Sequence, residues 1–446
     1  VLLVSIGFFM QALDTTIVNT AIPAMAHHLN EDPLRMHSVV VAYVLSVAAC
    51  IPLSGWLADR FGVRNTFLSA IIIFTLASLG CGLSQSLNQL LFFRVIQGVG
   101  GALLLPVGRL SLLKIIPRTQ FLAAMSLMSL AGLLGPLAGP TLGGWLVEVA
   151  TWHWIFLINI PMGVLGILMT LKVMPNVKEP TVKTFDLIGF VLLVVAMIGW
   201  SLGIEHLASP EYSKWFSISL LVVGVVATLW YAYHSHTHQN ALFRSRLFRN
   251  KIYAIGILGN FFARFGGNAL PFVLPLMLQV AFGFEPFIAG LMMIPLVLGS
   301  LFSKPIVRPI IQKMGYRRFL LVNTTLVGLC IASFAIMTVD TPTWFRALHF
   351  FLFGTLNSLQ FVGMNTLTLK DLPQQDASSG NSFLSMIMML SMSIGVALAG
   401  TLINIFTDYY GTAHVTTAFH VTLICLGCIN IITALIFWQI PKNTPV

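Results

Sequence analysis

The sequence is short of charge. Only 9% of its 446 residues are Asp, Glu, Lys or Arg, whereas 57% are hydrophobic, and the mean hydropathy is +0.90. An ordinary soluble domain carries roughly 25% charged residues, so this composition excludes a soluble globular protein. Apolar runs of about 20 residues recur along the whole chain, which is the length that crosses a bilayer as a helix. We therefore expect a membrane protein with many spans.

Several functional motifs are also missing. No G-x-x-x-x-G-K-[ST] stretch is present, so we do not expect ATP to drive the protein. The five cysteines fall inside apolar runs, which argues against an extracellular disulfide framework. No nucleophile, base or set of metal ligands gathers at one membrane depth, and we expect neither an enzyme nor a metal site. The run HSHTH at 234–238 is the one possible metal tract, and we interpret it as the end of a helix.

Hydropathy over a window of about 19 residues predicts fourteen transmembrane helices. They cover residues 1–26, 37–58, 65–84, 88–113, 120–147, 153–173, 187–206, 215–236, 252–281, 286–308, 317–338, 342–368, 377–407 and 415–440. The chain starts at Val1 inside an apolar run, and we expect a short segment to precede it.

Basic residues are distributed unevenly between the two sides. Most of the 24 Lys and Arg fall in loops on one side, whereas only Arg35, Lys214 and Arg346 fall in loops on the other. Cytoplasmic loops carry the excess of Lys and Arg, so we expect a multi-pass protein of the bacterial inner membrane with both termini in the cytoplasm. The net charge of +10 then reflects topology and contact with anionic lipid, and we expect no nucleic-acid partner.

Two loops resemble each other and indicate an internal repeat. DRFGVR at 59–64 and QKMGYR at 312–317 each follow the second span of a six-span block. We therefore predict an N-terminal six-helix bundle at 1–173, a linker with two extra transmembrane helices at 174–251, and a C-terminal six-helix bundle at 252–446. Transporters are commonly built from such facing repeats.

Five stretches together resemble the major facilitator superfamily, and within it the fourteen-helix drug:proton antiporter branch of the EmrB/QacA type. They are LDTTIVNTAIP at 13–23, GWLADRFGVR at 55–64, RVIQGVGGA at 94–102, GPLAGPTLGG at 135–144 and WHWIFLINIPMG at 152–163. The resemblance implies the major facilitator fold, an all-α membrane protein of two six-helix bundles plus two inserted helices. It also implies export of small organic solutes in exchange for protons.

The loop after the second span is predicted to act as a conformational latch. It contains Gly55, Asp59, Arg60, Gly62 and Arg64. In the family this loop braces the two bundles, and here the expected partner of Asp59 is the start of the thirteenth span, at Ser378 and Ser379. The alternative is a simple turn in which Gly62 supplies an unusual backbone angle.

The fifth span is predicted to be a tightly packed, flexible seam. Small residues at Gly135, Gly139, Gly143 and Gly144 allow close helix approach. Pro136 and Pro140 remove helix hydrogen bonds and permit bending.

Asp14 and Arg94 are predicted to couple transport to protons. Both lie well inside the membrane, where ionisable groups usually face an aqueous cavity and pair with one another. Gln11 and Gln97 each lie one helical turn from one of them and extend the polar face. A carboxylate binds a proton more readily when it is unpaired and partly desolvated than when it is paired with arginine. If Asp14 alternates between these two states, it takes up and releases a proton in each cycle. The alternative is that Asp14 only pins the first helix through hydrogen bonds.

Further polar residues are predicted to line the substrate cavity. We assign Gln11, Gln97, Arg109, Arg264, Asn268, Asn357 and Gln360 to it. The alternative is that the amides join helices and that Arg109 reaches the headgroups.

We predict a proton-coupled antiporter for multidrug efflux that works by alternating access. The expected partners are a small-molecule substrate, protons and membrane lipids, with no cofactor beyond the proton gradient and with the chain as a monomer. The spans hold three arginines against one central acid, Asp14, so an exporter of an anionic metabolite or metal chelate, such as citrate or iron-citrate, is the first alternative. A passive channel or facilitator is the second.

Overall fold

The computed structural model describes residues 1–115, 118–178, 184–209 and 212–441. Helices make up its regular structure, and no strand occurs among these residues. The long helices are α1 (Leu2–Leu29), α2 (His37–Phe61), α3 (Val63–Gly82), α4 (Leu87–Ile115), α5 (Arg118–Val149), α8 (Leu187–Glu205), α9 (Lys214–Thr237), α13 (Ile294–Ser333), α14 (Thr343–Lys370), α15 (Gln374–Tyr410) and α16 (Val415–Thr433). Shorter helices are α6 (Trp154–Leu157), α7 (Asn159–Val173), α10 (Lys251–Phe262), α11 (Phe265–Leu276) and α12 (Pro286–Met292), with short turns η1 (Pro33–Arg35), η2 (His206–Ala208), η3 (Ser245–Arg249) and η4 (Met277–Ala281).

Twelve segments of the described residues are long and apolar enough to cross a membrane. This is fewer than the fourteen predicted spans, so the count of fourteen stays a prediction. One of the twelve, 286–336, is 51 residues long, and Gly315 inside it has a non-helical backbone with φ +74°. This segment therefore bends at the QKMGYR loop. Elsewhere predicted single spans are broken helices, as where α10 and α11 meet at Arg264.

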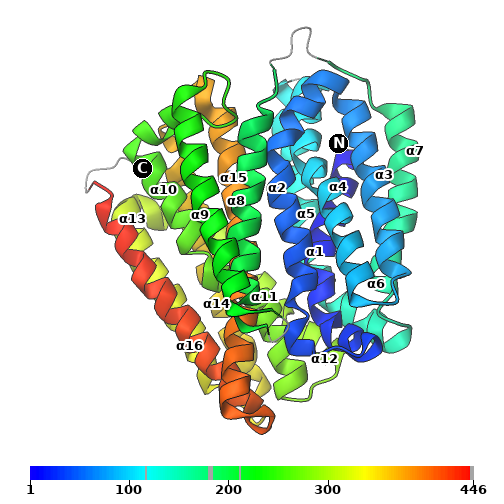
Figure 1. The fold of residues 1–446 in the computed structure, drawn as a ribbon, viewed down its shortest axis with the longest axis vertical. Helices are drawn as coiled ribbons and strands as arrows, with labels where there is room; N and C mark the ends of the chain where they lie inside the picture. Colours follow the sequence, from blue (N-terminus) through cyan, green and yellow to red (C-terminus); the bar gives the residue numbers. More distant parts are fainter. Residues whose placement is uncertain (116–117, 179–183, 210–211, 442–446) are drawn as a thin grey trace.

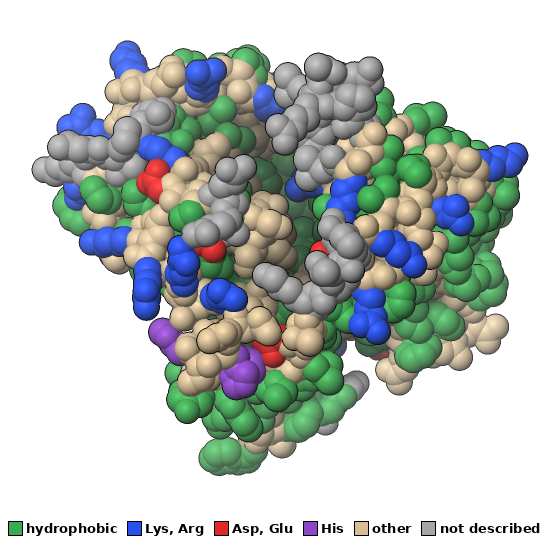
Figure 2. Space-filling view, turned by 90° about the horizontal axis from the view of Figure 1, so that it is seen from above, with side chains coloured by type: hydrophobic (Ala, Val, Ile, Leu, Met, Phe, Trp, Pro, Cys, Tyr) green, Lys and Arg blue, Asp and Glu red, His purple; other side chains and the backbone are tan. Residues whose placement is uncertain are grey.

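Helices α1–α7 gather on one side of the molecule and most of α10–α16 on the other, whereas α12 lies beneath α1 and packs on α5; the ends of the chain lie toward the same end (Figure 1). That end carries the loops around Arg60, Arg244 and Arg317 and is called the basic end below; the opposite end is called the far end. When the molecule is viewed from the basic end, Lys and Arg side chains surround a hollow in the middle of this face (Figure 2).

The two bundles contact each other closely at the far end. The backbone amide of Phe287 donates to Glu148 Oε1 at 2.9 Å, and Gln279 Nε2 donates to the carbonyl of Thr20 at 3.0 Å. Thr141 Oγ1 also donates to the carbonyl of Gly290 at 3.4 Å. The structure is therefore closed at the far end.

The inserted helices α8 and α9 form a hairpin that packs on both bundles. At Gly199 and Gly224 the two backbones approach so closely that a Cβ on Gly199 would lie 2.6 Å from the amide nitrogen of Gly224. Ser201 and Ser393 share a 2.6 Å hydrogen bond between α8 and α15, and α8 also packs on α2. The hairpin thus lies across the boundary between the bundles.

Candidate functional site

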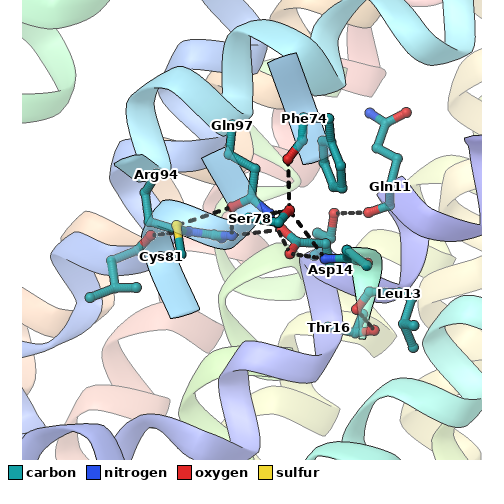
Figure 3. Close-up of polar contacts among 12 residues, drawn as sticks. Gln11, Leu13, Asp14, Thr16, Phe74, Ser78, Cys81, Arg94 and Gln97 are labelled. Atoms are coloured by element: carbon teal, nitrogen blue, oxygen red, sulfur yellow. Dashed lines mark hydrogen bonds and ion pairs between the residues drawn. The ribbon is translucent and has the colours of Figure 1, made fainter. Parts of the chain in front are cut away.

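Asp14 lies at the centre of a buried polar network in the N-terminal half. Its Oδ2 accepts a hydrogen bond from Arg94 Nη1 at 2.6 Å, and its Oδ1 accepts one from Gln97 Nε2 at 2.8 Å (Figure 3). Asn159 Nδ2 approaches Oδ1 at 3.3 Å. Asp14 is 0% exposed and Arg94 is 1% exposed. Helices α1, α4 and α7 therefore meet on one carboxylate.

Arg94, the positively charged partner of Asp14, is also held by several contacts. Arg94 Nε donates to the carbonyl of Val39 at 3.1 Å, and Nη1 also donates to Gln97 Oε1 at 2.7 Å. The guanidinium carbon lies 4.3 Å from the centre of the Tyr43 ring, a cation–π contact. A buried charge is tolerated only when paired and hydrogen-bonded, and both conditions are met here. Losing either partner would leave the other charge buried and uncompensated.

The structure brings together Asp14, Arg94 and Gln97, and Asp14 is in the arginine-paired one of its two predicted states. The acid is fully buried in this conformation, and amide and guanidinium groups donate to both of its carboxylate oxygens. Gln97, assigned to the substrate cavity, is 0% exposed and belongs to this network. Gln11 is also buried, and its side chain points away from Asp14 (Figure 3).

Sequence reasoning missed Asn159 and Ser78 as members of the network, and also Cys81, whose Sγ lies 3.7 Å from Gln97 Oε1. Asn159 lies within the quoted stretch 152–163, at the break between α6 and α7, which was the available signal. Ser78 Oγ accepts from Gln97 Nε2 at 2.9 Å, and only its position in an otherwise apolar helix could have suggested it.

The glycines of α5 pack against the helix that carries Asp14. A Cβ on Gly135 would lie 2.7 Å from the amide nitrogen of Leu13, and one on Gly143 would lie 2.5 Å from the carbonyl oxygen of Ile17. Gly139 packs in the same way on Thr16. The α1–α5 seam thus runs directly beside the acid.

The far end of α5 packs instead against the C-terminal half. A Cβ on Gly144 would overlap the carbonyl oxygen of Pro286, and one on Gly290 would overlap that of Pro140. Pro136 and Pro140 lie inside the helix, where each removes a backbone hydrogen bond. Helix α5 therefore joins the Asp14 helix to the contact that closes the far end.

The loop motif (Gly55–Arg64) is a turn tied to its own bundle in this structure. Asp59 Oδ1 lies 3.1 Å from Lys114 Nζ on α4, so in this conformation it pairs with its own bundle, and the contact expected with Ser378 and Ser379 stays a prediction for another conformation. Gly62 has φ +92°, as the turn alternative requires. The expected partners lie at the start of α15 in the other bundle, and the basic end is the hollowed one (Figure 2).

The remaining residues of the motif stay near the turn. The guanidinium carbon of Arg60 lies 5.2 Å from the centre of the Trp56 ring. Arg64 Nε is buried with no hydrogen-bond partner among the described atoms, and Gly55 has open space around it.

Arg264 is a buried cation at the break between α10 and α11. Its Nε donates to Asn260 Oδ1 at 2.9 Å, its Nη2 donates to Asn365 Oδ1 at 3.0 Å, and the guanidinium carbon lies 4.4 Å from the centre of the Phe361 ring. Within the described part of the chain no carboxylate pairs with it. Neutral amides and a ring thus hold this charge.

The other predicted cavity residues divide into two groups. Gln360 is 2% exposed and joins helices, since it accepts from Asn323 at 2.8 Å and donates to Thr324 at 2.6 Å. This is the interhelical alternative, so its assignment to the cavity is corrected. Asn268 and Asn357 are half-buried, and Asn357 lies against Gly267 of α11.

Arg109 is half-buried on α4, and its Nε has no hydrogen-bond partner among the described atoms. The HSHTH run closes the α8–α9 hairpin, because His234 Nε2 lies 2.8 Å from Asp186 Oδ1. Among the described residues no group of three or more His, Cys, Asp or Glu is arranged to hold a metal ion.

Comparison with known proteins decides the family. The profile of the Major Facilitator Superfamily matches residues 4–396. This chain belongs to that superfamily. It is 51% identical over 99% of its length to a protein of Escherichia coli O6:H1 named "Putative multidrug resistance protein MdtD", of which the match covers 94%. A protein of the same name from Enterobacter sp. (strain 638) is 50% identical with the same coverage.

Solved structures of the superfamily share the fold. The crystal structure of a D-xylose–proton symporter superposes with a TM-score of 0.73 at 15% identity, covering 99% of this chain and 98% of the other. A bacterial homologue of the human lysosomal transporter Spinster gives 0.69 at 14% identity, covering 98% and 95%. The chain is thus a multi-pass transporter of the major facilitator superfamily and not an enzyme.

Proposed function

We propose that the protein is a proton-coupled antiporter that exports small organic solutes, including drugs, across the bacterial inner membrane. The observation that carries the proposal is the fully buried Asp14, held by Arg94 and Gln97 beside the glycine seam of α5. The basic end is taken as cytoplasmic because cytoplasmic loops carry the excess of Lys and Arg. Both termini then lie in the cytoplasm (Figure 1).

In the proposed cycle, this structure is the conformation after a proton has left toward the cytoplasm. Asp14 is ionised and paired with Arg94. When the far end opens, a proton from the periplasm neutralises the carboxylate, and the attraction to Arg94 falls because one charge of the pair is lost. A proton thereby controls how α1 is held against α4.

Helix α5 transmits this change. It packs on α1 through Gly135 and Gly143 and on α12 through Gly144. A shift of α1 therefore moves the surface that closes the far end. Packed helices switch between discrete arrangements. A small displacement beside Asp14 can therefore open the far end and close the basic end. The proton gradient is the only energy source in this scheme; no cofactor takes part, and a monomer in contact with lipid suffices.

The loop motif acts as the latch of the second state. Asp59, now paired with Lys114, would turn to the start of α15 when the basic end closes. A carboxylate at a helix N-terminus is favoured by the helix dipole and the free backbone N–H groups.

The test is transport in proteoliposomes by an Asp14→Asn variant. Wild-type protein should accumulate ethidium or citrate against its gradient when a pH gradient is imposed, and Asp14→Asn should not. The variant should still exchange labelled for unlabelled solute at equilibrium, because exchange needs alternating access without net proton movement. Asp408→Asn, on the exposed far end of α15, is the matched control and should behave as wild type.

Removal of the charge of Asp14 leaves Arg94 buried and unpaired, which can destabilise the protein by about 3–5 kcal/mol. The double variant Asp14→Asn/Arg94→Gln removes both charges and checks that loss of coupling is not loss of fold. Gradient-driven accumulation by a folded double variant would contradict the proposal. Absence of exchange in wild-type protein, with flux that follows only the electrochemical potential, would indicate a channel.

Anionic solutes are a second candidate class of substrate, and a different residue, Arg264, supports them. Arg264 is a buried guanidinium without an acidic partner among the described residues, and such a group binds carboxylates and repels cations. An anionic solute such as citrate or its iron chelate would pair with it, with Asn268 and Asn357 nearby. Transport of ethidium, citrate and ferric citrate by wild type, Arg264→Ala and Arg264→Lys separates the classes. Loss of citrate transport alone supports the anion, and unchanged citrate transport in Arg264→Ala contradicts it.

A further inference from the structure

A cavity of about 580 Å³ lies between the N-terminal bundle and the inserted hairpin, away from the Asp14 network. It runs from the far end toward the middle of the membrane. Its walls are largely apolar and come from α2, α4 and α8; they include Leu45, Ala49, Leu91, Val95, Val194 and Ile198. This volume lies in the range of small-molecule sites, roughly 300–1,000 Å³.

A buried carboxylate closes the far-end part of this cavity. Glu205, the last residue of α8, is 8% exposed, and no hydrogen bond to its carboxylate occurs within the described part of the chain. The nearest basic group is His37 of α2, whose Nε2 lies 3.9 Å from Glu205 Oε1, too far for a hydrogen bond. An ionised carboxylate in apolar surroundings requires a partner.

The histidine beside it is also incompletely satisfied. His37 is 4% exposed, its Nδ1 lies 3.4 Å from the carbonyl of Leu34, and its Nε2 has no hydrogen-bond partner among the described atoms. Two buried polar groups therefore face the cavity with unused hydrogen-bonding capacity. Asn404 of α15 adds an amide to the same wall.

The charges around the cavity favour a cation. Among the described residues that line it, Glu205 and Glu31 are the acidic groups, and Arg35 is the one Lys or Arg. Arg35 itself lies 4.0 Å from Asp32, which reduces its effect. His37 and His206 also line the wall and add positive charge only when protonated.

We propose that this cavity binds an amphiphilic organic cation, with its apolar groups against α2, α4 and α8 and its charge beside Glu205. The site lies outside the transport route proposed above and does not depend on it. Val95 and Ile198 are more than a third exposed at its edge, so the cation would enter sideways from the bilayer. The polar end of the cavity then lies at the headgroup depth of the leaflet at the far end.

The test is equilibrium binding of tetraphenylphosphonium to the purified full chain in lipid nanodiscs. Tetraphenylborate, of similar size and opposite charge, is the ligand control. Wild type should bind the cation at least tenfold more tightly than the anion, and Glu205→Gln should weaken cation binding at least tenfold. Glu285→Gln, an exposed far-end carboxylate outside the cavity, should leave binding unchanged.

A second variant tests the location without altering charge. Val95→Trp, at a partly exposed position of the wall, should fill the cavity and also weaken binding at least tenfold. Thermal unfolding of each variant confirms that it is folded. Equal cation binding by wild type, Glu205→Gln and Val95→Trp would overturn the proposal. Binding in detergent that disappears in nanodiscs would show that phospholipid fills the cavity and would overturn it as well.

Discussion

At the far end two glycines face backbone carbonyl groups across the bundle boundary, and we predict that closure of this end depends on them. Replacing Gly144 by alanine places a methyl group where the carbonyl oxygen of Pro286 lies. Both atoms belong to helices, so no flexible side chain can move aside, and the helices themselves must separate. The perturbation therefore acts against the far-end-closed state alone.

The size of the effect follows from this overlap. Extra carbon in a well-packed contact typically costs about 1–3 kcal/mol. If the open state does not bear this cost, the ratio of far-end-open to far-end-closed molecules rises about 5- to 150-fold. Gly166→Ala is the control, because its methyl group would meet only the end of the Ile71 side chain, at 3.2 Å, within one bundle. Both variants replace a helical glycine by alanine, so the gain in helix propensity is the same in the two and does not explain a difference between them.

The assay is the distance between spin labels on the two bundles at the far end. Cysteines introduced at the exposed positions Glu31 and Asp408, in a background without the five native cysteines, carry the labels. Gly144→Ala should shift the distribution toward the longer distances of the open state, and Gly166→Ala should match wild type. If Gly144→Ala also matches wild type, the α5–α12 contact does not control closure and the reasoning is refuted.

Two further predictions concern the latch and the buried network. A disulfide between cysteines at positions 59 and 379 should form only under conditions that open the far end, such as in Gly144→Ala, whereas equal formation in wild type would place the latch in both states. Gln97→Leu should lower the thermal unfolding midpoint, because Asp14, Arg94 and Ser78 each lose a hydrogen bond and a lost bond to a charged group costs about 1.5–3 kcal/mol. Asn65→Leu, at an exposed position of α3, should not; equal midpoints for both variants would mean that the network is not tightly coupled to stability.

Sequence reasoning anticipated the all-helical fold because hydropathy reports directly on burial in lipid. It also placed Asp14 and Arg94 in the membrane, where a lone charge needs a partner. It assigned Gln97 and Gln360 to the substrate cavity, whereas in the structure both side chains are buried in hydrogen bonds to neighbouring helices. Those hydrogen-bond partners come from distant parts of the chain.

The latch shows a second limit. The loop motif predicts Asp59 as the acid of the latch, but the motif alone does not say which residue pairs with it, because the partner comes from a distant part of the chain. In this structure Lys114 of the same bundle takes that position. The cavity beside Glu205 was missed for a related reason, because the acid ends one helix while His37 begins another. Only the packing of α8 on α2 brings them together.

The central claim is that the protonation of Asp14 sets which end of the transporter is open. The most direct measurement is the far-end spin-label distance as the pH is changed from mildly alkaline to mildly acidic, in wild type and in Asp14→Asn/Arg94→Gln. The wild type should move from the closed toward the open distance on acidification, because the proton removes the charge that binds α1 to Arg94, and the double variant should lose that response. A double variant that keeps the full pH response of wild type would contradict the account.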